Sequence, residues 1–375
     1  MKIDDYRDSE LVKKITRLIS KTIPSRKIKI MHVCGTHENF IGRFGLRSLL
    51  PENIELVAGP GCPVCVCPAS DINTAIEIAS MDNVILATFG DMIRVPSRIS
   101  SENNENDSLQ TAKSRGADVR IIYSPLDAQK IAEKNPDKRV VFFSVGFETT
   151  AAGVASLIYN NPPDNFSILS SHRLIPPSME LLLGIGDIQI DGFLLPGHVT
   201  TVIGMKPFEI FPEAYLMPTV SAGFEPLDIL SAVLNIVEQI KEGKASLTNK
   251  YTRAVKEDGN PKAIKIMSDV FEEVSSYWRG IGRIPRSGLK LRDKYSKWDA
   301  NKIFDIEKGD KDFFDIHPHC SCHLIMIGKI YPPDCPLFAK KACNPENPFG
   351  PCMVSMDGTC RIWYRYGQKT VGSMQ

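Results

Sequence analysis

The sequence predicts an α/β protein built from two parallel-sheet α/β domains, a helical segment and a small cysteine-rich C-terminal module. Short β-branched runs alternate with helical patterns, which is typical of parallel strands joined by helical crossovers. A polar stretch at residues 101–108 separates three of these runs from the next four. Six of the ten cysteines fall between Cys320 and Cys360, where hydrophobic periodicity is weak. A chain of 375 residues has room for two or three domains, because a domain averages roughly 150 residues.

The elements are expected in a simple order along the chain. Apolar residues recur at helical spacing over residues 9–23 and predict one amphipathic helix. Seven runs rich in β-branched residues then predict strands over residues 27–33, 54–59, 83–90, 118–124, 139–146, 166–171 and 192–197. Helical periodicity returns over residues 229–240 and 263–274, and these helices are expected to brace the α/β body. Beyond Pro285, frequent Pro, Gly, Cys and His favour a module organised around a cofactor.

These patterns divide the chain into three predicted parts. Residues 1–110 form a first α/β domain with the N-terminal helix, and residues 111–225 form a second one. Residues 226–375 contain the helical segment and the C-terminal module. The boundary between the α/β domains is expected within residues 101–117.

Charge and hydropathy exclude several classes of function. The 45 basic and 44 acidic side chains leave a net charge of +1, which lacks the basic excess of a nucleic-acid-binding protein. The sequence has no apolar run of about 18 residues, and its N-terminus is charged, so we expect a cytoplasmic protein outside the membrane. Neither common Gly-rich nucleotide-binding motif follows the first strand, so nucleotide binding is not predicted.

The cysteines require an explanation other than structural disulfides, because the cytoplasm is reducing. Four lie within the first fifth of the chain, Cys34, Cys62, Cys65 and Cys67, and residues 68–319 contain none. Buried inert thiols would be scattered along the chain. Clustering in two groups therefore favours metal or redox chemistry.

Unusual polar segments follow the predicted strands where parallel strands end. They are residues 34–38, 59–65, 89–91, 146–150, 171–173 and 196–200. In doubly wound sheets, the loops at the carboxyl ends of the strands form the ligand crevice. Their convergence predicts a functional cleft between the two α/β domains.

Cys34 is the first candidate nucleophile or metal ligand. It stands where a strand passes into a helix, and free N–H groups at a helix N-terminus favour a thiolate. His37 and Glu38 follow closely and are expected near that sulfur. Cys62 and Cys65 have C-x-x-C spacing, which suits either a reversible disulfide or two ligands of a soft metal ion. Cys67 breaks this spacing and is interpreted as a packing or auxiliary residue.

The C-terminal cysteines have a more specific pattern. Fourteen, seven and sixteen residues separate Cys320, Cys335, Cys343 and Cys360, while Cys322 and Cys352 remain over. Four thiolates suit either zinc or a 4Fe-4S cluster. Structural zinc sites commonly use paired C-x-x-C knuckles, which this segment lacks, so the spacing favours the cluster. The neighbouring residues His317, His319 and His323 could be ligands in a zinc site, but they are interpreted as surface groups or as groups supporting the ligands.

Six segments together resemble the HypD family of NiFe-hydrogenase maturation proteins. They are CGTHE at 34–38, GPGCPVC at 59–65, TFGDMIRVP at 88–96, GFETT at 146–150, PGHVT at 196–200 and PENPFGPCMVSMDGTC at 345–360. The resemblance runs over almost the whole chain. It implies two similar α/β domains and a third domain holding a 4Fe-4S cluster.

The resemblance also implies a function and a set of site residues. Such proteins are scaffolds on which an iron carrying two cyanides and one carbon monoxide is assembled for the hydrogenase large subunit. Their partners are HypC, which shares the iron, and HypE, which carries the cyanide precursor as a thiocyanate. By matching motif, Cys34 is the iron-binding thiolate with His37 beside it, Cys62 and Cys65 are the redox pair, and Glu148 and His198 line the cleft. The cluster ligands fall on Cys320, Cys335, Cys343 and Cys360, with the choice between Cys320 and Cys322 left open.

Simple chemistry agrees with these roles. Low-spin iron(II) needs soft ligands together with open positions for diatomic ligands. Release of cyanide from a thiocyanate consumes two electrons, which a dithiol can store, and Cys322 and Cys352 are candidates for an intermediate relay. These features predict a redox-active assembly scaffold rather than a conventional turnover enzyme.

Two other functions remain open from the residues alone. In the first, an iron-sulfur thiol-disulfide oxidoreductase uses Cys62 and Cys65 on a protein disulfide, which leaves Cys34 without a role. In the second, the C-terminal module holds structural zinc and Cys34 is the nucleophile of a hydrolase.

Overall fold

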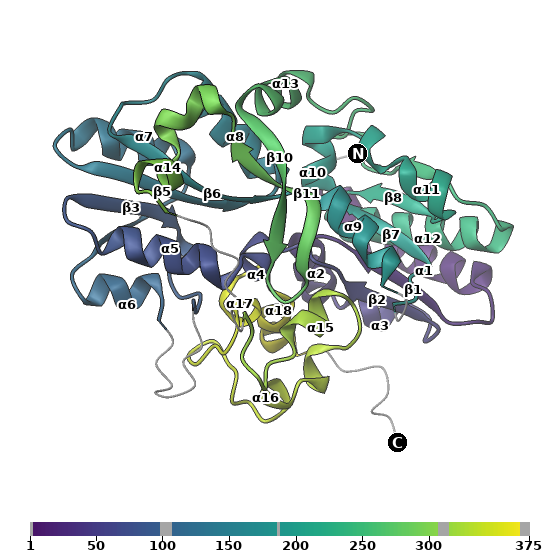
Figure 1. Cartoon of the computed structure of the whole chain (residues 1–375). Coiled ribbons are helices and arrows are strands. Elements are labelled where there is room, and N and C mark those ends of the chain that lie inside the picture. The colour runs from purple at the N-terminus through teal and green to yellow at the C-terminus, as the bar shows by residue number, and fades with distance from the viewer. Residues whose placement is uncertain (1–2, 98–106, 186–187, 307–314, 368–375) are drawn as a thin grey trace.

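The computed structural model describes residues 3–97, 107–185, 188–306 and 315–367. Two sheets lie side by side, and a long β-hairpin runs between them towards the C-terminal module (Figure 1). The predicted α/β class with two parallel-dominated sheet domains is therefore confirmed.

The first sheet is entirely parallel. Its order is β2 (Ile54–Ala58), β1 (Ile28–His32), β7 (Gly192–Pro196), β8 (Thr219–Ala222) and β9 (Leu247–Asn249). The second sheet has the order β10 (Phe271–Trp278), β11 (Gly282–Leu291), β6 (Phe166–Arg173), β5 (Arg139–Gly146), β3 (Val84–Phe89) and β4 (Asp118–Ile122). Strands β3 to β6 are parallel, and the β10–β11 hairpin adds to β6 in the antiparallel sense.

All seven predicted strands exist, but the sheets divide the chain differently from the prediction. Strand β3 belongs to the second sheet, and β7 returns to the first sheet beside β1. Residues 1–110 and 111–225 therefore do not each supply one sheet. Periodicity locates a buried strand but carries no information about its neighbour, which explains the error. The predicted boundary lies partly outside the described residues, at 101–106.

The helices cover the sheets and join their strands. The longer ones are α1 (Ser9–Thr22), α2 (Gly35–Arg43), α5 (Ala69–Ala79), α7 (Pro125–Lys134), α8 (Glu148–Tyr159), α9 (Ile175–Gly184), α10 (Gly197–Ile203), α12 (Pro226–Glu242) and α13 (Pro261–Val270). Short helices include α3 (Leu46–Leu49), α4 (Pro63–Val66), α6 (Leu109–Ser114), α11 (Ile210–Tyr215) and α14 (Ala300–Ile303). The predicted helices at 9–23 and 229–240 are confirmed as α1 and α12.

The hairpin is the main element that the sequence prediction missed. The helix predicted over residues 263–274 ends at Val270, and β10 begins at the next residue. Side chains of β10 alternate between buried or half-buried and exposed positions, as expected for a strand with two different faces. The sequence FEEVSSYW itself does not alternate apolar and polar residues, and it follows directly on a helical pattern, so periodicity did not reveal the strand.

The C-terminal module consists of short helices joined by loops. They are α15 (Cys322–Met326), α16 (Pro336–Ala339), α17 (Pro351–Val354) and α18 (Thr359–Tyr366), and they lie below α2 and α4 in the view of Figure 1. Buried Ile325, Met326 and Met353 share one apolar cluster with Met31 and Val57 of the first sheet. The module is therefore packed onto the sheet and adds one wall to the space beyond β1 and β2.

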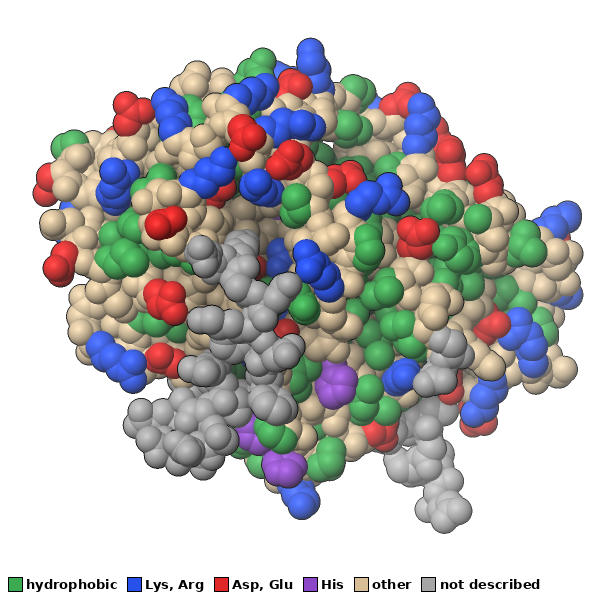
Figure 2. All heavy atoms as spheres, in the orientation of Figure 1, with side chains coloured by type: hydrophobic (Ala, Val, Ile, Leu, Met, Phe, Trp, Pro, Cys, Tyr) green, Lys and Arg blue, Asp and Glu red, His purple; other side chains and the backbone are tan. Residues whose placement is uncertain are grey.

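The visible surface agrees with the near-zero net charge. Basic and acidic side chains are intermixed over the face shown in Figure 2. In the described part of the chain, no helix has the length and apolarity needed to cross a membrane.

Trp278 of the hairpin is one of the largest fully buried side chains, and replacing this side chain tests how the hairpin packs. Trp278 stacks on Phe147 and donates its indole N–H to Ser287 Oγ at 2.8 Å. We expect Trp278→Ala to lower the free energy of unfolding by about 3–5 kcal/mol, because it leaves a cavity between hairpin and sheet. Chemical denaturation measures this change, with Tyr123→Ala as a control because Tyr123 is 91% exposed. A loss no larger than that of the control would contradict the packing described.

Candidate functional site

Three segments that are distant in sequence enclose one small cavity at the carboxyl ends of β1 and β2. The lining residues are His32, Cys34, Gly35, Glu38, Ala58, Gly59, Gly61, Cys62, Cys65, Met326, Cys352, Asp357 and Thr359. The first strand exit supplies Cys34, the second supplies Cys62 and Cys65, and the C-terminal module supplies Cys352. Four of the cysteines selected from sequence therefore meet around the same space.

Two glycines allow these segments to lie so close together. A Cβ atom on Gly61 would lie 2.2 Å from the backbone N of Cys34 and the backbone C of Val33. A Cβ atom on Gly35 would lie 2.4 Å from the backbone O of Asp357 in the C-terminal module. The Gly35 N–H also donates to the Gly61 carbonyl at 3.0 Å. Any side chain at these two positions would push the walls of the cavity apart.

Cys34 is the N-cap residue of α2 and is only 9% exposed. Burial raises the pKa of its thiol to about 11, although the backbone N–H groups of His37 and Thr36 act in the opposite direction. The nearby Asp357 carboxylate raises it further. The expectation of a thiolate favoured by the helix N-terminus is thus corrected, since desolvation outweighs the helix end. A bound cation would reverse this balance, because metal binding displaces the thiol proton.

Cys62 and Cys65 are joined by a disulfide that lies against the cavity. Cys62 is the N-cap of α4, and the Cys65 N–H donates to Cys62 Sγ at 3.2 Å. The hydroxyl of Ser355, from the C-terminal module, lies 3.4 Å from Cys62 Sγ. The pair therefore lies against both the cavity at Cys34 and the C-terminal module.

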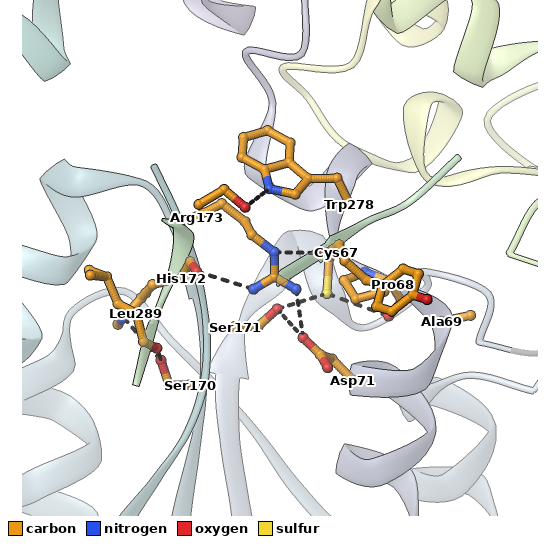
Figure 3. A network of polar contacts seen from close by, with 12 residues as sticks. Cys67, Pro68, Ala69, Asp71, Ser170, Ser171, His172, Arg173, Trp278 and Leu289 are labelled. Carbon is orange, nitrogen blue, oxygen red and sulfur yellow. Dashed lines mark hydrogen bonds and ion pairs between the residues drawn. The ribbon is translucent and has the colours of Figure 1, made fainter. Parts of the chain in front are cut away.

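Cys67 points away from the cavity into the polar network of Figure 3. Its sulfur lies 3.4 Å from Ser171 Oγ, and Ser171 donates to Asp71 Oδ2 at 2.7 Å. Arg173 pairs with the same carboxylate at 3.1 Å and donates to the carbonyl of Tyr277. The network ties the C-x-x-C loop to β6 and β10 of the second sheet. Burial raises the pKa of Cys67 to about 12.

Glu38 is the centre of a second buried network at the cavity. Its Oε2 accepts hydrogen bonds from His32 Nε2 and Arg47 Nη2, both at 2.6 Å, and its Oε1 accepts from the Trp363 indole at 2.7 Å. Burial alone would raise the pKa of Glu38, but the Arg47 guanidinium and the bond from His32 lower it to about 2. The carboxylate is therefore charged and fully satisfied.

Sequence reasoning missed His32, Arg47, Asp357 and Trp363, which complete this side of the cavity or support it. One signal for His32 was present. It is the last residue of β1, two positions before Cys34, and alternate residues of an extended segment share a face. No comparable signal marks Trp363, which is 325 residues from Glu38 in the sequence.

His37 does not line this cavity. Its Nε2 lies 2.8 Å from the carbonyl O of Gly223, and its ring packs on Phe224 with centroids 4.8 Å apart. Burial lowers the pKa of His37 to about 3. His198, on α10, packs on the same Phe224 ring at 4.1 Å. Both histidines therefore belong to the end of the first sheet beside β7 and β8.

Glu148 also lies outside the cavity, at the start of α8. Its Oε1 accepts the backbone N–H of Ile175 at 2.8 Å, and Oε2 has no partner among the described residues. Burial raises the pKa of Glu148 to about 7. Helix α8 contacts α10, so Glu148 and His198 stand on neighbouring helices between the two sheets.

The six C-terminal cysteines are all buried and adjoin one another. The Cys320 thiol contacts those of Cys322 and Cys335, Cys343 lies near Cys335 and Cys352, and Cys360 contacts Cys352. Gly350 leaves room for this packing, because a Cβ there would lie 3.2 Å from Cys320 Sγ. This donor set fits a 4Fe-4S cluster held by four thiolates. Among the described residues, no three His, Cys, Asp or Glu side chains have the arrangement of a site for a single ion.

Comparisons with known proteins show which family the chain belongs to. The HypD family, described as "Hydrogenase formation hypA family", matches residues 8–367. The chain is 42% identical over 376 residues to hydrogenase maturation factor HypD2 of Bradyrhizobium diazoefficiens, covering 97% of this chain and 96% of that protein. It is 41% identical to hydrogenase maturation factor HypD of Azotobacter vinelandii, covering 98% and 97%. A putative hydrogenase expression/formation protein of Methanocaldococcus jannaschii is 46% identical, covering 96% and 99%.

Similarity at this level extends over almost the full length of each relative and includes every segment that builds the cavity. The chain belongs to the HypD family of hydrogenase maturation factors.

Proposed function

We propose that this chain is the scaffold on which the Fe(CN)2CO centre of NiFe-hydrogenase is assembled, together with HypC and with cyanide delivered by HypE. The observation that carries the proposal is the meeting of Cys34, the Cys62–Cys65 disulfide and Cys352 at one cavity. A thiol that can bind metal, a two-electron redox pair and a cysteine of the C-terminal group therefore lie around the same cavity. The finished centre then passes to the hydrogenase large subunit.

Iron enters this scheme as a substrate. The thiolate of Cys34 holds the ion from this chain, and a thiolate of HypC holds it from the partner. Soft sulfur ligands suit low-spin iron(II) and leave positions for cyanide and carbon monoxide. Burial of Cys34 supports the role, because a thiol with a raised pKa stays protonated and unreactive until a cation replaces the proton.

Cyanide release is the redox step at the cavity. A thiocyanate on HypE and the dithiol form of Cys62 and Cys65 react to give a thiol on HypE, hydrogen cyanide and the Cys62–Cys65 disulfide. The C–S bond of the thiocyanate breaks, and the dithiol supplies two electrons and two protons. The disulfide in the structure corresponds to the product state of this step.

The disulfide must then be reduced again. A 4Fe-4S cluster held by Cys320, Cys335, Cys343 and Cys360 would supply electrons one at a time when bound. Cys352 lines the cavity and also contacts Cys360, so its thiol is the candidate relay between the disulfide and the cluster, and Cys322, which also lies near Cys360, is the other relay candidate. Either Cys320 or Cys322 would complete the ligand set.

The first test concerns Cys34. Replacing it with Ser substitutes a harder oxygen donor whose proton is held more tightly, so the iron should lose its anchor. We expect Cys34→Ser to abolish the infrared cyanide and carbon monoxide bands of the purified complex with HypC, and to abolish hydrogenase maturation. The C-terminal iron and sulfide should remain, because those cysteines lie in a separate module. Full maturation by this variant would refute the scaffold role of Cys34 and favour a thiol-disulfide oxidoreductase.

The second test separates cluster ligands from relay cysteines. The anaerobic protein should contain about four irons and four sulfides per chain, and Cys343→Ala should lose most of both. Cys352→Ala should keep the iron and sulfide, but the Cys62–Cys65 disulfide should no longer be reduced when an electron donor is added. Metal analysis and mass spectrometry after alkylation measure the two outcomes. Stoichiometric zinc in the wild type, or normal reduction in Cys352→Ala, would contradict the respective assignment.

A further inference from the structure

We propose that His32 is a second ligand of this chain to the iron at Cys34, binding the ion through Nδ1. The inference rests on the proposed function, because it assigns a further residue to the same iron. Nothing in the comparisons or in the segments that carry the family resemblance assigns a role to this histidine.

The backbone directs His32 and Cys34 to the same space. His32 ends β1 and Cys34 is still extended, with φ −152° and ψ 126°. Two residues apart on an extended chain, their side chains point to the same face, and both line the cavity. His32 is only 1% exposed, so its ring has no access to bulk water.

Hydrogen bonding fixes which ring nitrogen is free. Nε2 lies 2.6 Å from Glu38 Oε2, and that carboxylate is also bound by Arg47 and by the Trp363 indole. A carboxylate only accepts hydrogen bonds, so Nε2 is the nitrogen that carries the shared proton, and Nδ1 is the ring nitrogen left to bind a metal ion. Nδ1 is buried and has no partner among the described residues. A buried polar atom without a protein partner is rare and requires an explanation, and at a cavity a bound water or metal ion is one that the geometry allows.

This arrangement is the usual setting of a metal-binding histidine. Such residues typically donate the other ring N–H to a carboxylate, which fixes the tautomer and makes the free nitrogen a better ligand. Glu38 has this role here. The Arg47 and Trp363 contacts in turn prevent Glu38 from rotating, so the imidazole is held in place before iron arrives.

The coordination number of the cargo supports the same assignment. Two cyanides, one carbon monoxide and the thiolates of Cys34 and HypC occupy all but one position of an octahedral low-spin iron(II). An imidazole nitrogen suits iron(II) and would fill the remaining position. His37, the histidine suggested by the sequence, instead contacts Gly223 and Phe224 outside the cavity.

Co(II) is a suitable probe, because it binds thiolate and imidazole and is paramagnetic. We expect the anaerobic full-length protein, with Cys62–Cys65 kept as the disulfide, to bind Co(II) and give a thiolate charge-transfer band that Cys34→Ser abolishes. Pulsed EPR of protein with 15N-labelled histidine should show coupling to an imidazole nitrogen. His32→Gln should lose this coupling and bind Co(II) at least about tenfold more weakly. Glu38→Gln should weaken binding by about 10- to 100-fold, because the acceptor of the ring N–H loses its negative charge and no longer makes Nδ1 a stronger ligand.

The control variant is His172→Gln, since His172 is equally buried but lies on β6 and bonds to Ser144 outside the cavity. It should keep both the coupling and the affinity. Cys34-dependent Co(II) binding by the wild type without imidazole coupling would overturn the role of His32 and leave the scaffold proposal standing. Absence of any Cys34-dependent binding would instead overturn the proposed function, and the His32 inference with it. The wild-type measurement decides between these outcomes even where a variant fails to fold.

Discussion

The site depends on the close approach of two strand exits, where the backbone of Gly61 lies against Val33 and Cys34. A Cβ atom at Gly61 would come within 2.2 Å of that backbone, so only glycine permits the contact. Because β1 and β2 are adjacent parallel strands in register from Ile28 with Ile54 to His32 with Ala58, their loops leave the sheet side by side. The contact brings Cys34 to the C-x-x-C pair, and Gly35 repeats the arrangement against the C-terminal module. The glycines in the two motifs are thus packing requirements of one cavity.

Burial and neighbouring charge give Cys34 and Glu38, both at the cavity, opposite pKa shifts. The same low-dielectric surroundings that raise the pKa of Cys34 would also raise that of Glu38. Arg47 prevents this for Glu38 alone, so a fixed carboxylate and a neutral thiol stand on either side of the cavity. A cation that binds Cys34 displaces the thiol proton and gains a thiolate ligand. The charged carboxylate of Glu38 lines the same cavity.

The strands and most of the candidate site residues could be predicted from the sequence, but their arrangement in space could not. All seven predicted strands were correct, because β-branched runs of buried parallel strands are a local signal. The return of β7 to the side of β1 is a long-range pairing with no local signal, and it changed the strand membership of both sheets. Cys34 was selected for its position between a strand and a helix, and Cys62 and Cys65 for their C-x-x-C spacing; the structure places all three at one cavity. The sequence did not single out His32, because its contact with Glu38, and the contacts of Glu38 with Arg47 and Trp363, form only when the chain folds.

The C-terminal module is part of the site as well as a carrier of cysteines. Trp363 bonds to Glu38, Asp357 packs against Gly35, and Cys352 reaches the cavity from the same module. If the module shifted, Glu38 would lose a donor, and the cavity would open on the side of the disulfide. The packing of Ile325 and Met326 on the first sheet opposes such a shift. In the proposed function, reduction of the C-x-x-C pair and binding of iron at Cys34 would therefore both depend on this docked position of the C-terminal module.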